Sequence, residues 1–289
     1  MTKVHVRMGV NCSCFSLRVV YLAVTRKSEK LRAVPPFLFI IMKKLLLIAF
    51  LAIVSIGVKA EIASGTCGDN ASWSLSDDGI LEIFGTGEIT NTFVYDSRGS
   101  WFYYYQSDIK EVIIKEGIVS IGDYAFKNCS NITKIEIPSS VNYIGNQAFY
   151  NCRKLLEISL SGSVKSIGDE SFLGCKSLTD VKISEGLSSI GFCAFQNCSS
   201  LVNVNIPLSI KNIGTSAFAG CSALPVVDNI RYADTYLVGA TDKTLETYKI
   251  QEGTRFIGPN AFYNCSILTS ITIPESVIYI NQSAFFGCM

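Results

Sequence analysis

The sequence predicts a solenoid, a β-rich α/β superhelix of about 23-residue repeats with a β-hairpin as its N-terminal cap. Cysteine recurs every 23 residues with one interruption, and phenylalanine stands three residues before each of these cysteines. Such self-similarity at a fixed period is typical of stacked-repeat proteins. The cysteines are Cys129, Cys152, Cys175, Cys198, Cys221, Cys265 and Cys288. The phenylalanines are Phe126, Phe149, Phe172, Phe195, Phe218, Phe262 and Phe285.

Charge divides the chain into two unlike segments. Of its 25 basic and 24 acidic residues, ten and one lie in residues 1–60, which leaves 15 and 23 in residues 61–289 and a net charge of −8 there. A nucleic-acid partner calls for clustered lysine and arginine, so we expect none.

Residues 42–60 have the pattern of a signal peptide. Two lysines follow Met42, an uncharged run covers Leu45–Val58, and residues suited to cleavage precede Glu61. The run is shorter than the roughly 20 apolar residues that span a bilayer. The alternative is a retained anchor over Phe37–Val58, which would bury two lysines in the membrane at about 3 kcal/mol each.

Residues 1–41 show no periodicity, and we interpret them as a non-native upstream extension. The only histidine, His5, lies in this segment. The mature chain is therefore expected to be exported, either secreted or held at the cell surface, and to contain no histidine.

Residues 61–108 do not repeat and are expected to form the cap. Ser72–Leu75 alternates, a turn signal begins at Asp77, and Ile80–Phe84 is a second strand. An open solenoid end exposes a core and a sheet edge, so it needs a cover. The aromatic cluster Trp101–Tyr105 is expected in the core of the cap, with a ligand-stacking surface as the alternative.

One repeat illustrates the expected coil. Ile135 and its second neighbour alternate with Glu136 and so share one face of a short strand, which Pro138 ends. Gly145 suits a turn that needs an unusual backbone angle. The segment Asn146–Cys152 fits a single helical turn that tucks its phenylalanine inward.

Residues 109–289 hold the repeats, none of which can bury its apolar face alone. Stacked coils pair their strands at about 4.8 Å, so each inward residue lies over its equivalent in the next coil. We expect ladders of phenylalanine, cysteine and aliphatic side chains. Coordinates that separate Phe149 from Phe172 would refute this fold.

One irregular coil, at residues 225–247, lacks the phenylalanine and the cysteine. Within it, Arg231–Val238 is expected to form a small hairpin. Insertions in a solenoid map to loops on one face, so this coil is a candidate for specificity. The alternative is a degenerate coil that only packs. The sequence stops at Met289 within a repeat, so the last coil is expected to be frayed, part of a fragment or paired with a partner.

These residues resemble the BspA-like subgroup of leucine-rich repeats, found in bacterial surface proteins. The unit Ile135–Cys152 carries the pattern I-x-I-P, I-G-x-x-A-F and a closing cysteine, and the opening Ser64–Asn70 with Trp73 is also similar. The resemblance covers about residues 64–289. It implies a curved leucine-rich repeat solenoid outside the cell and roles in adhesion, and it brings no catalytic residues. The subgroup lacks the asparagine ladder of other leucine-rich repeats.

No catalytic residue, metal site or cofactor is expected. Without histidine after residue 60, Ser-His-Asp and Cys-His arrangements are unavailable. Cys193 and Cys198 are the only close cysteine pair of the mature chain, and Cys198 belongs to the ladder. Carboxylate pairs such as Asp169-Glu170 are interpreted as solvated turn residues, because a glycosidase would need two carboxylates facing across a cleft.

The nine cysteines after residue 60 are expected to be buried free thiols that act as small hydrophobic groups. Side chains stacked in parallel point their sulfur atoms alike, so a disulfide would distort the coils. Cys193 with Cys198 is the pair to test for oxidation.

The predicted binding surface consists of the outward strand positions, whose identity varies while the inward positions stay fixed. These residues are Lys134, Glu136, Glu157, Ser159, Asp180, Lys182, Asn203, Asn205, Ser270 and Thr272. The alternative is that they are merely solvated.

The expected function is a protein-binding or adhesion scaffold whose partners are extracellular proteins of a host or of neighbouring cells. The alternatives are a structural surface component that self-associates through its uncapped C-terminal end and, least favoured, a hydrolase that uses carboxylates.

Overall fold

The computed structural model describes residues 60–90 and 103–288. Glu61–Met289 forms one compact unit, which is described below. The upstream extension predicted at residues 1–41 and the signal peptide predicted at 42–60 lie outside the described residues, apart from Ala60. Within the described residues, no helix reaches the length and apolarity that crossing a membrane requires.

This unit begins with three antiparallel strands, β1 (Glu61–Thr66), β2 (Ala71–Ser76) and β3 (Ile80–Gly85). The hairpin of β2 and β3 is confirmed, with Trp73 and Leu75 facing the core. β3 then pairs in parallel with the first coil, so the cap shares its core with the repeats. A short 3-10 helix, η2 (Tyr103–Tyr105), follows, and the ring of Tyr105 lies 6.0 Å from that of Trp73.

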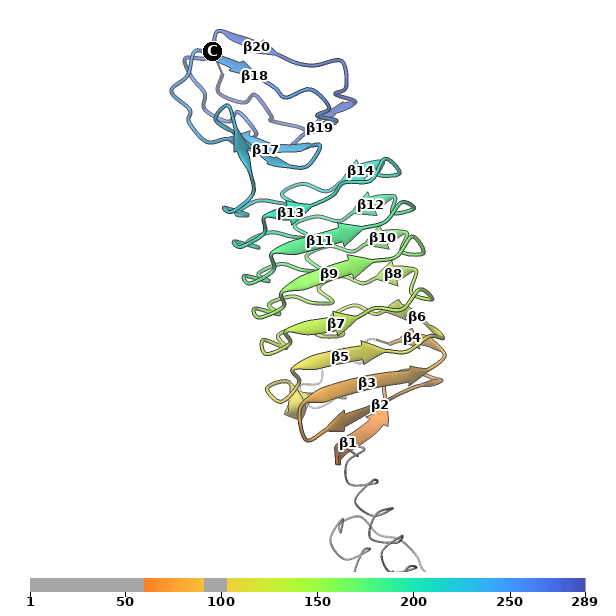
Figure 1. Cartoon of the computed structure of the whole chain (residues 1–289). Helices are drawn as coiled ribbons and strands as arrows, with labels where there is room; N and C mark the ends of the chain where they lie inside the picture. The colour runs from red at the N-terminus through yellow and green to blue at the C-terminus, as the bar shows by residue number, and fades with distance from the viewer. Residues whose placement is uncertain (1–59, 91–102, 289) are drawn as a thin grey trace, which may run out of the picture. The chain divides into compact units, whose positions relative to one another are not determined.

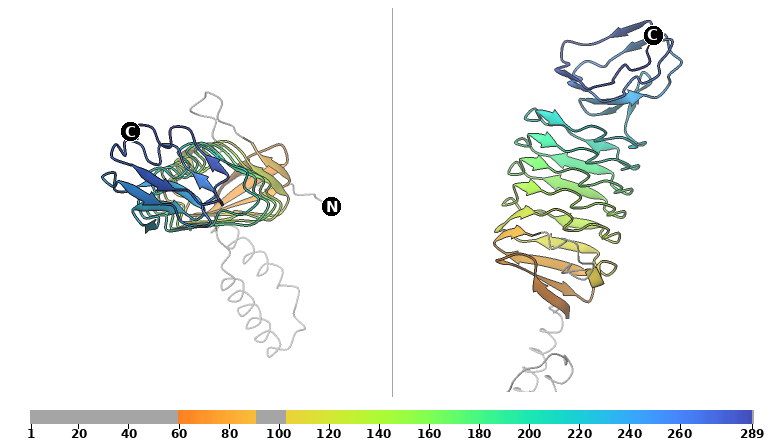
Figure 2. Two further views of the ribbon diagram at one scale, coloured as in Figure 1. Left: turned by 90° about the horizontal axis from the view of Figure 1, so that it is seen from above. Right: turned by 180° about the vertical axis from the view of Figure 1, so that it is seen from behind.

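Each regular coil contributes one strand to each of two sides (Figure 1). On one side lie β5 (Glu111–Ile114), β7 (Lys134–Glu136), β9 (Glu157–Leu160), β11 (Asp180–Ile183) and β13 (Asn203–Val204). On the other lie β4 (Gly87–Ile89), β6 (Ile118–Ile121), β8 (Tyr143–Ile144), β10 (Ser166–Ile167), β12 (Ser189–Ile190) and β14 (Asn212–Ile213). From β6 onwards the paired residues are 23 positions apart, so the regular coils superpose when viewed end-on (Figure 2).

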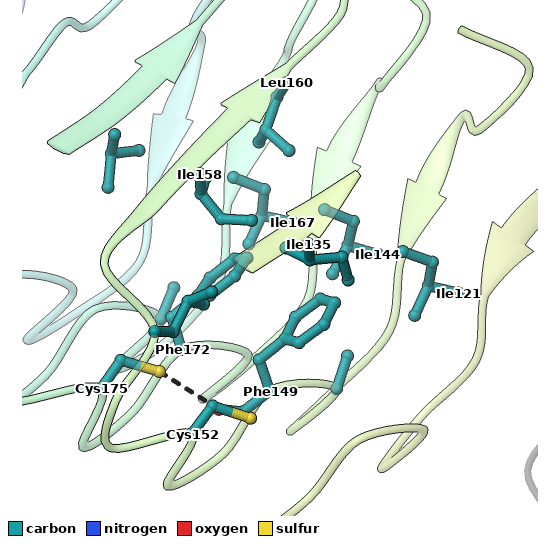
Figure 3. Packing of buried hydrophobic residues seen from close by; sticks show 14 of the residues in the cluster. Ile121, Ile135, Ile144, Phe149, Cys152, Ile158, Leu160, Ile167, Phe172 and Cys175 are labelled. Atoms are coloured by element: carbon teal, nitrogen blue, oxygen red, sulfur yellow. Dashed lines mark hydrogen bonds between the residues drawn. The ribbon is translucent and has the colours of Figure 1, made fainter. Parts of the chain in front are cut away.

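Phenylalanine rings stack from coil to coil inside the regular coils. Figure 3 shows two of them, Phe149 and Phe172. Phe149 and Phe172 lie with ring centroids 5.1 Å apart, and Phe172 and Phe195 are also 5.1 Å apart with planes within 2° of parallel. These rings are fully buried. The phenylalanine ladder, on which the predicted fold depends, is therefore confirmed.

Residues 146–151 form consecutive turns, so the helical turn expected at 146–152 is wrong. Gln147 has a positive φ of 53°, which an α-helix does not contain. The amide N–H of Tyr150 donates to the carbonyl of Gln147 at 3.1 Å, whereas that of Phe149 donates to the carbonyl of Ser171 in the next coil at 2.7 Å. A helix would keep both bonds within one coil. The turns instead give every second bond to the neighbouring coil.

Glycine opens the turn in most coils, with Asn281 in its place in the last one, and it does so for reasons of space, which corrects the expectation at Gly145. Its φ is not positive. A Cβ atom there would lie 2.5 Å from the main-chain nitrogen of Asp123 in the preceding coil. At Gly191 it would lie 2.5 Å from the carbonyl carbon of Gly168. At these two positions, successive coils therefore approach each other so closely that no side chain fits.

The irregular coil interrupts both sheets. Its strands are β15 (Val226–Val227), β16 (Ile230–Ala233) and β17 (Tyr236–Ala240). β16 and β17 pair in an antiparallel hairpin, as the sequence predicted. The later strands are β18 (Thr247–Lys249), β19 (Phe256–Ile257), β20 (Ser270–Thr272) and β21 (Tyr279–Ile280). They resume the parallel 23-residue register.

Tyr236 takes the place of the missing phenylalanine. Its ring lies 5.5 Å from that of Phe218 but is tilted by 54°, and its side chain is fully buried. The regular stacking returns between Phe262 and Phe285, whose rings are 5.2 Å apart and nearly parallel. The irregular coil therefore packs against the core of the regular coils.

Candidate functional site

The predicted binding residues lie on the outward side of strands β7, β9, β11, β13 and β20, or directly after β13. All are exposed except Asp180, which is half-buried. We call this surface the strand face, and its members are Lys134, Glu136, Glu157, Ser159, Asp180, Lys182, Asn203, Asn205, Ser270 and Thr272.

Parallel register brings half of the strand face together. Asp180 lies between Glu157 and Asn203, and Lys182 lies beside Ser159. By contrast, the two residues on β20 belong to a separate sheet with β18, and the two on β7 belong to the sheet that contains the cap. The strand face is therefore divided, and β9, β11 and β13 form its central part.

Lys134 on β7 pairs with two carboxylates, one on β5 and one on β7. The Nζ of Lys134 lies 2.9 Å from a carboxylate oxygen of Glu111 and 2.6 Å from one of Glu136. Hydrogen bonds to Glu136 and Glu111 raise the pKa of Lys134 above its usual value. Exposed pairs of this kind add little stability. With two carboxylates against one ammonium group, this part of the surface retains a net charge of −1.

An open hollow of about 360 Å³ lies at the end of the central part, where the irregular coil meets β11 and β13. It is lined by Asp180, Val181, Lys182, Val202, Asn203, Val204, Asn205, Pro225 and Asp234. A volume of this size is at the lower end of the range for ligand sites.

Asp180 is the central carboxylate of the hollow. Hydrogen bonds from Thr179 and from the side-chain amide of Asn203, which lies 2.8 Å away, lower the pKa of Asp180, and the charge of Lys182 acts in the same direction. The carboxylate is therefore ionised at neutral pH, and it is held toward its neighbour on β13.

Two side chains that line the hollow form hydrogen bonds with main-chain groups at the ends of the strands. The amide of Asn205 accepts from the main-chain nitrogen of Ile183 at 2.7 Å and donates to its carbonyl at 2.5 Å. A carboxylate oxygen of Asp234 accepts from the main-chain nitrogen of Ile206 at 2.7 Å. Asn205, predicted as a binding residue, thus has a structural role, because from just beyond the end of β13 it satisfies the main-chain N–H and carbonyl of Ile183.

Two arginines satisfy carbonyl groups at the interruption. Arg255 donates to the carbonyls of Pro207, Leu208 and Ile210 at 3.0 to 3.2 Å. Arg231 donates to the carbonyl of Leu224 at 3.0 Å and also to that of Ser222. Hydrogen bonds from a charged donor are the stronger kind, so these side chains substitute for the interrupted ladder.

Sequence reasoning missed five lining residues, Val181, Val202, Val204, Pro225 and Asp234. The one sequence signal for these residues was the interruption of the repeat at residue 225. It predicted the irregular coil but not which strands that coil packs against. It also missed a series of side-chain bonds between coils. Asp169 accepts from the main-chain nitrogen of Phe192 at 2.7 Å, so this carboxylate is more than a solvated turn residue.

In the described parts of the chain, no three histidine, cysteine or acidic side chains gather in a group that could hold a metal ion. The predicted binding residues instead offer charged, amide and hydroxyl groups on an open surface. Such an arrangement is suited to recognition by hydrogen bonds and charge.

The BspA type Leucine rich repeat region family matches residues 99–225 and 239–289, in six copies. The chain belongs to this family. The match stops at the irregular coil and resumes within β17, so the interruption seen in the sheets is also an interruption of the family pattern.

Solved structures of bacterial leucine-rich repeat proteins are similar to this family member. A leucine-rich repeat protein from Eubacterium ventriosum is 26% identical with a TM-score of 0.57, and the match covers 79% of this chain and 64% of that one. The chain therefore spans about two thirds of that relative. No curated protein matches.

Two further structures are similar at lower TM-scores. The T. pallidum Leucine Rich Repeat protein is 25% identical with a TM-score of 0.47, covering 75% of this chain and 85% of that one. A leucine rich cell surface protein from Faecalibacterium prausnitzii is 26% identical with a TM-score of 0.43, covering 78% and 74%.

The closing cysteine of the BspA-type repeat has a hydrogen-bonding role here. In residues 60–90 and 103–288, all nine cysteines are free thiols. The Sγ of Cys198 lies 3.2 Å from the carbonyl oxygen of Phe172 in the preceding coil, and Cys221 bonds to Phe195 in the same way. Cys193 is buried in the adjoining turn, where burial raises the pKa of its thiol.

Proposed function

We propose that this protein is an exported scaffold, secreted or held at the cell surface, whose strand face binds extracellular proteins of a host or of neighbouring cells without catalysing a reaction. One observation carries the proposal. At a single outward register the residue changes from Lys134 to Glu157, Asp180 and Asn203, while the adjacent inward positions remain aliphatic. Packing fixes the inward set and leaves the outward set free for recognition.

Export is supported by the sequence pattern of residues 42–60, and a surface location agrees with the printed description of the Faecalibacterium relative as a cell surface protein. Because the chain spans about two thirds of the Eubacterium relative, its partners are proposed for this chain alone.

A pull-down of host extracellular-matrix and serum proteins with the purified protein tests the proposal. We expect a captured partner to be lost when Glu136, Asp180 and Lys182 are changed together to alanine. These side chains are exposed or half-buried and point away from the core, so the fold should be unaffected.

The matched control changes Lys211, Glu252 and Glu275 to alanine. These residues are also exposed, carry the same two negative charges and one positive charge, and lie outside the strand face. A partner lost equally with both triple variants would indicate general electrostatic attraction. No partner at all, or one retained by the strand-face variant, would refute binding through this surface.

A second candidate is self-association through the last coil. Ile278 and Phe286 are each 62% exposed there, which is unusual for large apolar side chains. Light scattering over a range of protein concentrations should then show an increasing mass, which Phe286→Ser would abolish. A constant monomer mass would exclude this candidate.

A further inference from the structure

The strand β13 is the edge of its sheet. The strand order is β13-β11-β9, and the residues that follow β13 by 23 positions are those of β15. In a regular coil, β15 would pair with β13. Here β15 pairs with β16 in an antiparallel arrangement instead, so the side of β13 away from β11 is hydrogen-bonded to no strand of the described residues.

Main-chain geometry directs one amide group toward this edge. The amide N–H groups of Asn203 and Asn205 donate to the carbonyls of Thr179 and Val181, at 3.0 and 3.4 Å. Hydrogen-bonding groups alternate in direction along a strand, so the N–H of Val204 points to the opposite side. The next such group, that of Ile206, is already taken by Asp234.

The hollow lies beside this edge and has both apolar and charged surfaces. Val202, which is 43% exposed, and Pro225 supply apolar area. Asp180 and Asp234 supply two carboxylates against one ammonium group, that of Lys182. Glu157 lies beside Asp180 in the register and adds a further negative charge. A ligand with positive charge therefore complements the hollow.

We propose that the hollow binds an extended basic peptide segment of a partner protein, which pairs with β13 as an additional strand and places a lysine or arginine side chain against Asp180. In strand addition, main-chain hydrogen bonds provide affinity and surface pockets select alternate side chains. The interrupted coil provides both features, since it exposes the edge and supplies Pro225 and Asp234 as a wall. This inference rests on the proposed protein-binding function and assigns one site and one ligand class to it.

A random-peptide display library selected against the purified protein tests the proposal, and isothermal titration then measures each selected peptide. We expect the selected peptides to share a short segment with lysine or arginine and no proline. Asp180→Asn should weaken their binding, because it removes the charge while keeping an oxygen that can accept from Asn203. The effect should diminish as salt is added.

The edge is tested by Val204→Pro. Proline removes only the N–H that points away from β11, a position at which edge strands tolerate it. We expect binding at least about fivefold weaker from the lost hydrogen bond. The control Val204→Ala also loses the valine surface that lines the hollow but keeps the N–H, so Val204→Pro should bind the peptides about fivefold more weakly than Val204→Ala does.

Failure to select any peptide, or peptides that bind Val204→Pro and Asp180→Asn as tightly as they bind the unmodified protein, would overturn the proposal. A protein partner that is retained by Val204→Pro but lost with the strand-face triple variant would leave the scaffold function intact and refute strand addition alone. Loss of all partners in every assay would refute both.

Discussion

The thiol of Cys175 donates a hydrogen bond to the main-chain carbonyl oxygen of Phe149, one coil away, at a distance of 3.2 Å (Figure 3). The same bond joins Cys152 to Phe126. The turns give alternate N–H groups to the next coil, and the thiol supplies a donor to one carbonyl per coil. Cysteine therefore serves here as a small, weakly donating core residue, and a disulfide would remove that donor.

Thiol reactivity should follow burial. Burial raises the pKa of Cys175 to about 12, so its reactive thiolate is scarce at pH 8. We expect iodoacetamide to modify Cys175 only after unfolding, and the half-buried Cys288 to react in the native protein. Mass spectrometry of peptides after timed labelling measures both. Rapid native alkylation of Cys175 would contradict the described packing.

Ring deletions should depend on the number of stacked neighbours. Phe172 lies between two rings at 5.1 Å and is fully buried, so Phe172→Ala should lower the free energy of unfolding by about 4 kcal/mol. Phe285 has one such neighbour, Phe262, and is half-buried, so Phe285→Ala should cost clearly less. Urea denaturation followed by circular dichroism compares the two. An equal decrease in the free energy of unfolding for the two variants would show that ring stacking between coils does not determine the cost of losing a ring.

The column of glycines predicts a contrast between two alanine substitutions. A Cβ atom at Gly191 would lie within 2.6 Å of main-chain atoms of the preceding coil, so Gly191→Ala must separate coils and should cost about 3 kcal/mol. Gly253 has a φ of +85° but nothing within 4 Å of an added Cβ, so Gly253→Ala should cost about 1 kcal/mol. Thermal unfolding of both variants tests this, and a Gly253 variant as unstable as Gly191→Ala would count against it.

Acid should weaken one contact between coils. The carboxylate of Glu185 accepts from the main-chain nitrogens of Leu208 and Ser209 at 3.0 and 3.1 Å, and these bonds lower its pKa below the usual 4.5. A lowered folded-state pKa means that the contribution is complete above about pH 4.5 and is lost as the pH falls through the folded-state value.

The Glu185→Gln variant should therefore have a lower Tm at pH 7 and a smaller decrease in Tm between pH 5 and pH 3 than the unmodified protein. Glu252→Gln is the control, since the described residues contain no hydrogen bond between its carboxylate and the turn at 274–276. Parallel pH profiles for the Glu185 variant and the unmodified protein would show that this contact does not titrate.

The sequence was sufficient to predict the ladders because they depend on period alone. Residues 23 positions apart must superpose if the coils stack, and Phe149 and Phe172 do so. The strand β1 was not predicted, since its residues are mostly exposed and lack the alternation that Trp73 and Leu75 give to β2. The expected helical turn failed because the backbone angle of Gln147 has no sequence signature.

The hollow lay beyond sequence reasoning for a different reason. The position of Asp180 on the outward face followed from alternation. That Pro225 and Asp234 would lie beside it depends on how the hairpin folds back onto the last regular coil, and this depends on tertiary contacts such as that of Asp234 with Ile206. The same holds for the arginine at residue 255, whose partners are three carbonyls almost 50 positions earlier in the chain.

The tilted meeting of Phe218 with Tyr236 has a mechanical consequence. In a linear stack of coils, each coil stabilises only its direct neighbours. This stabilisation is strongest where aromatic rings stack in parallel and the strands of adjacent coils are hydrogen-bonded without interruption. The parallel stacking and the strand pairing are both lost at this junction. The coils before it and the coils after it are therefore expected to unfold, by heat or by applied force, as two separate cooperative units. A ligand that pairs with β13 as an added strand and also contacts the irregular coil would couple the two units, so that they unfold together.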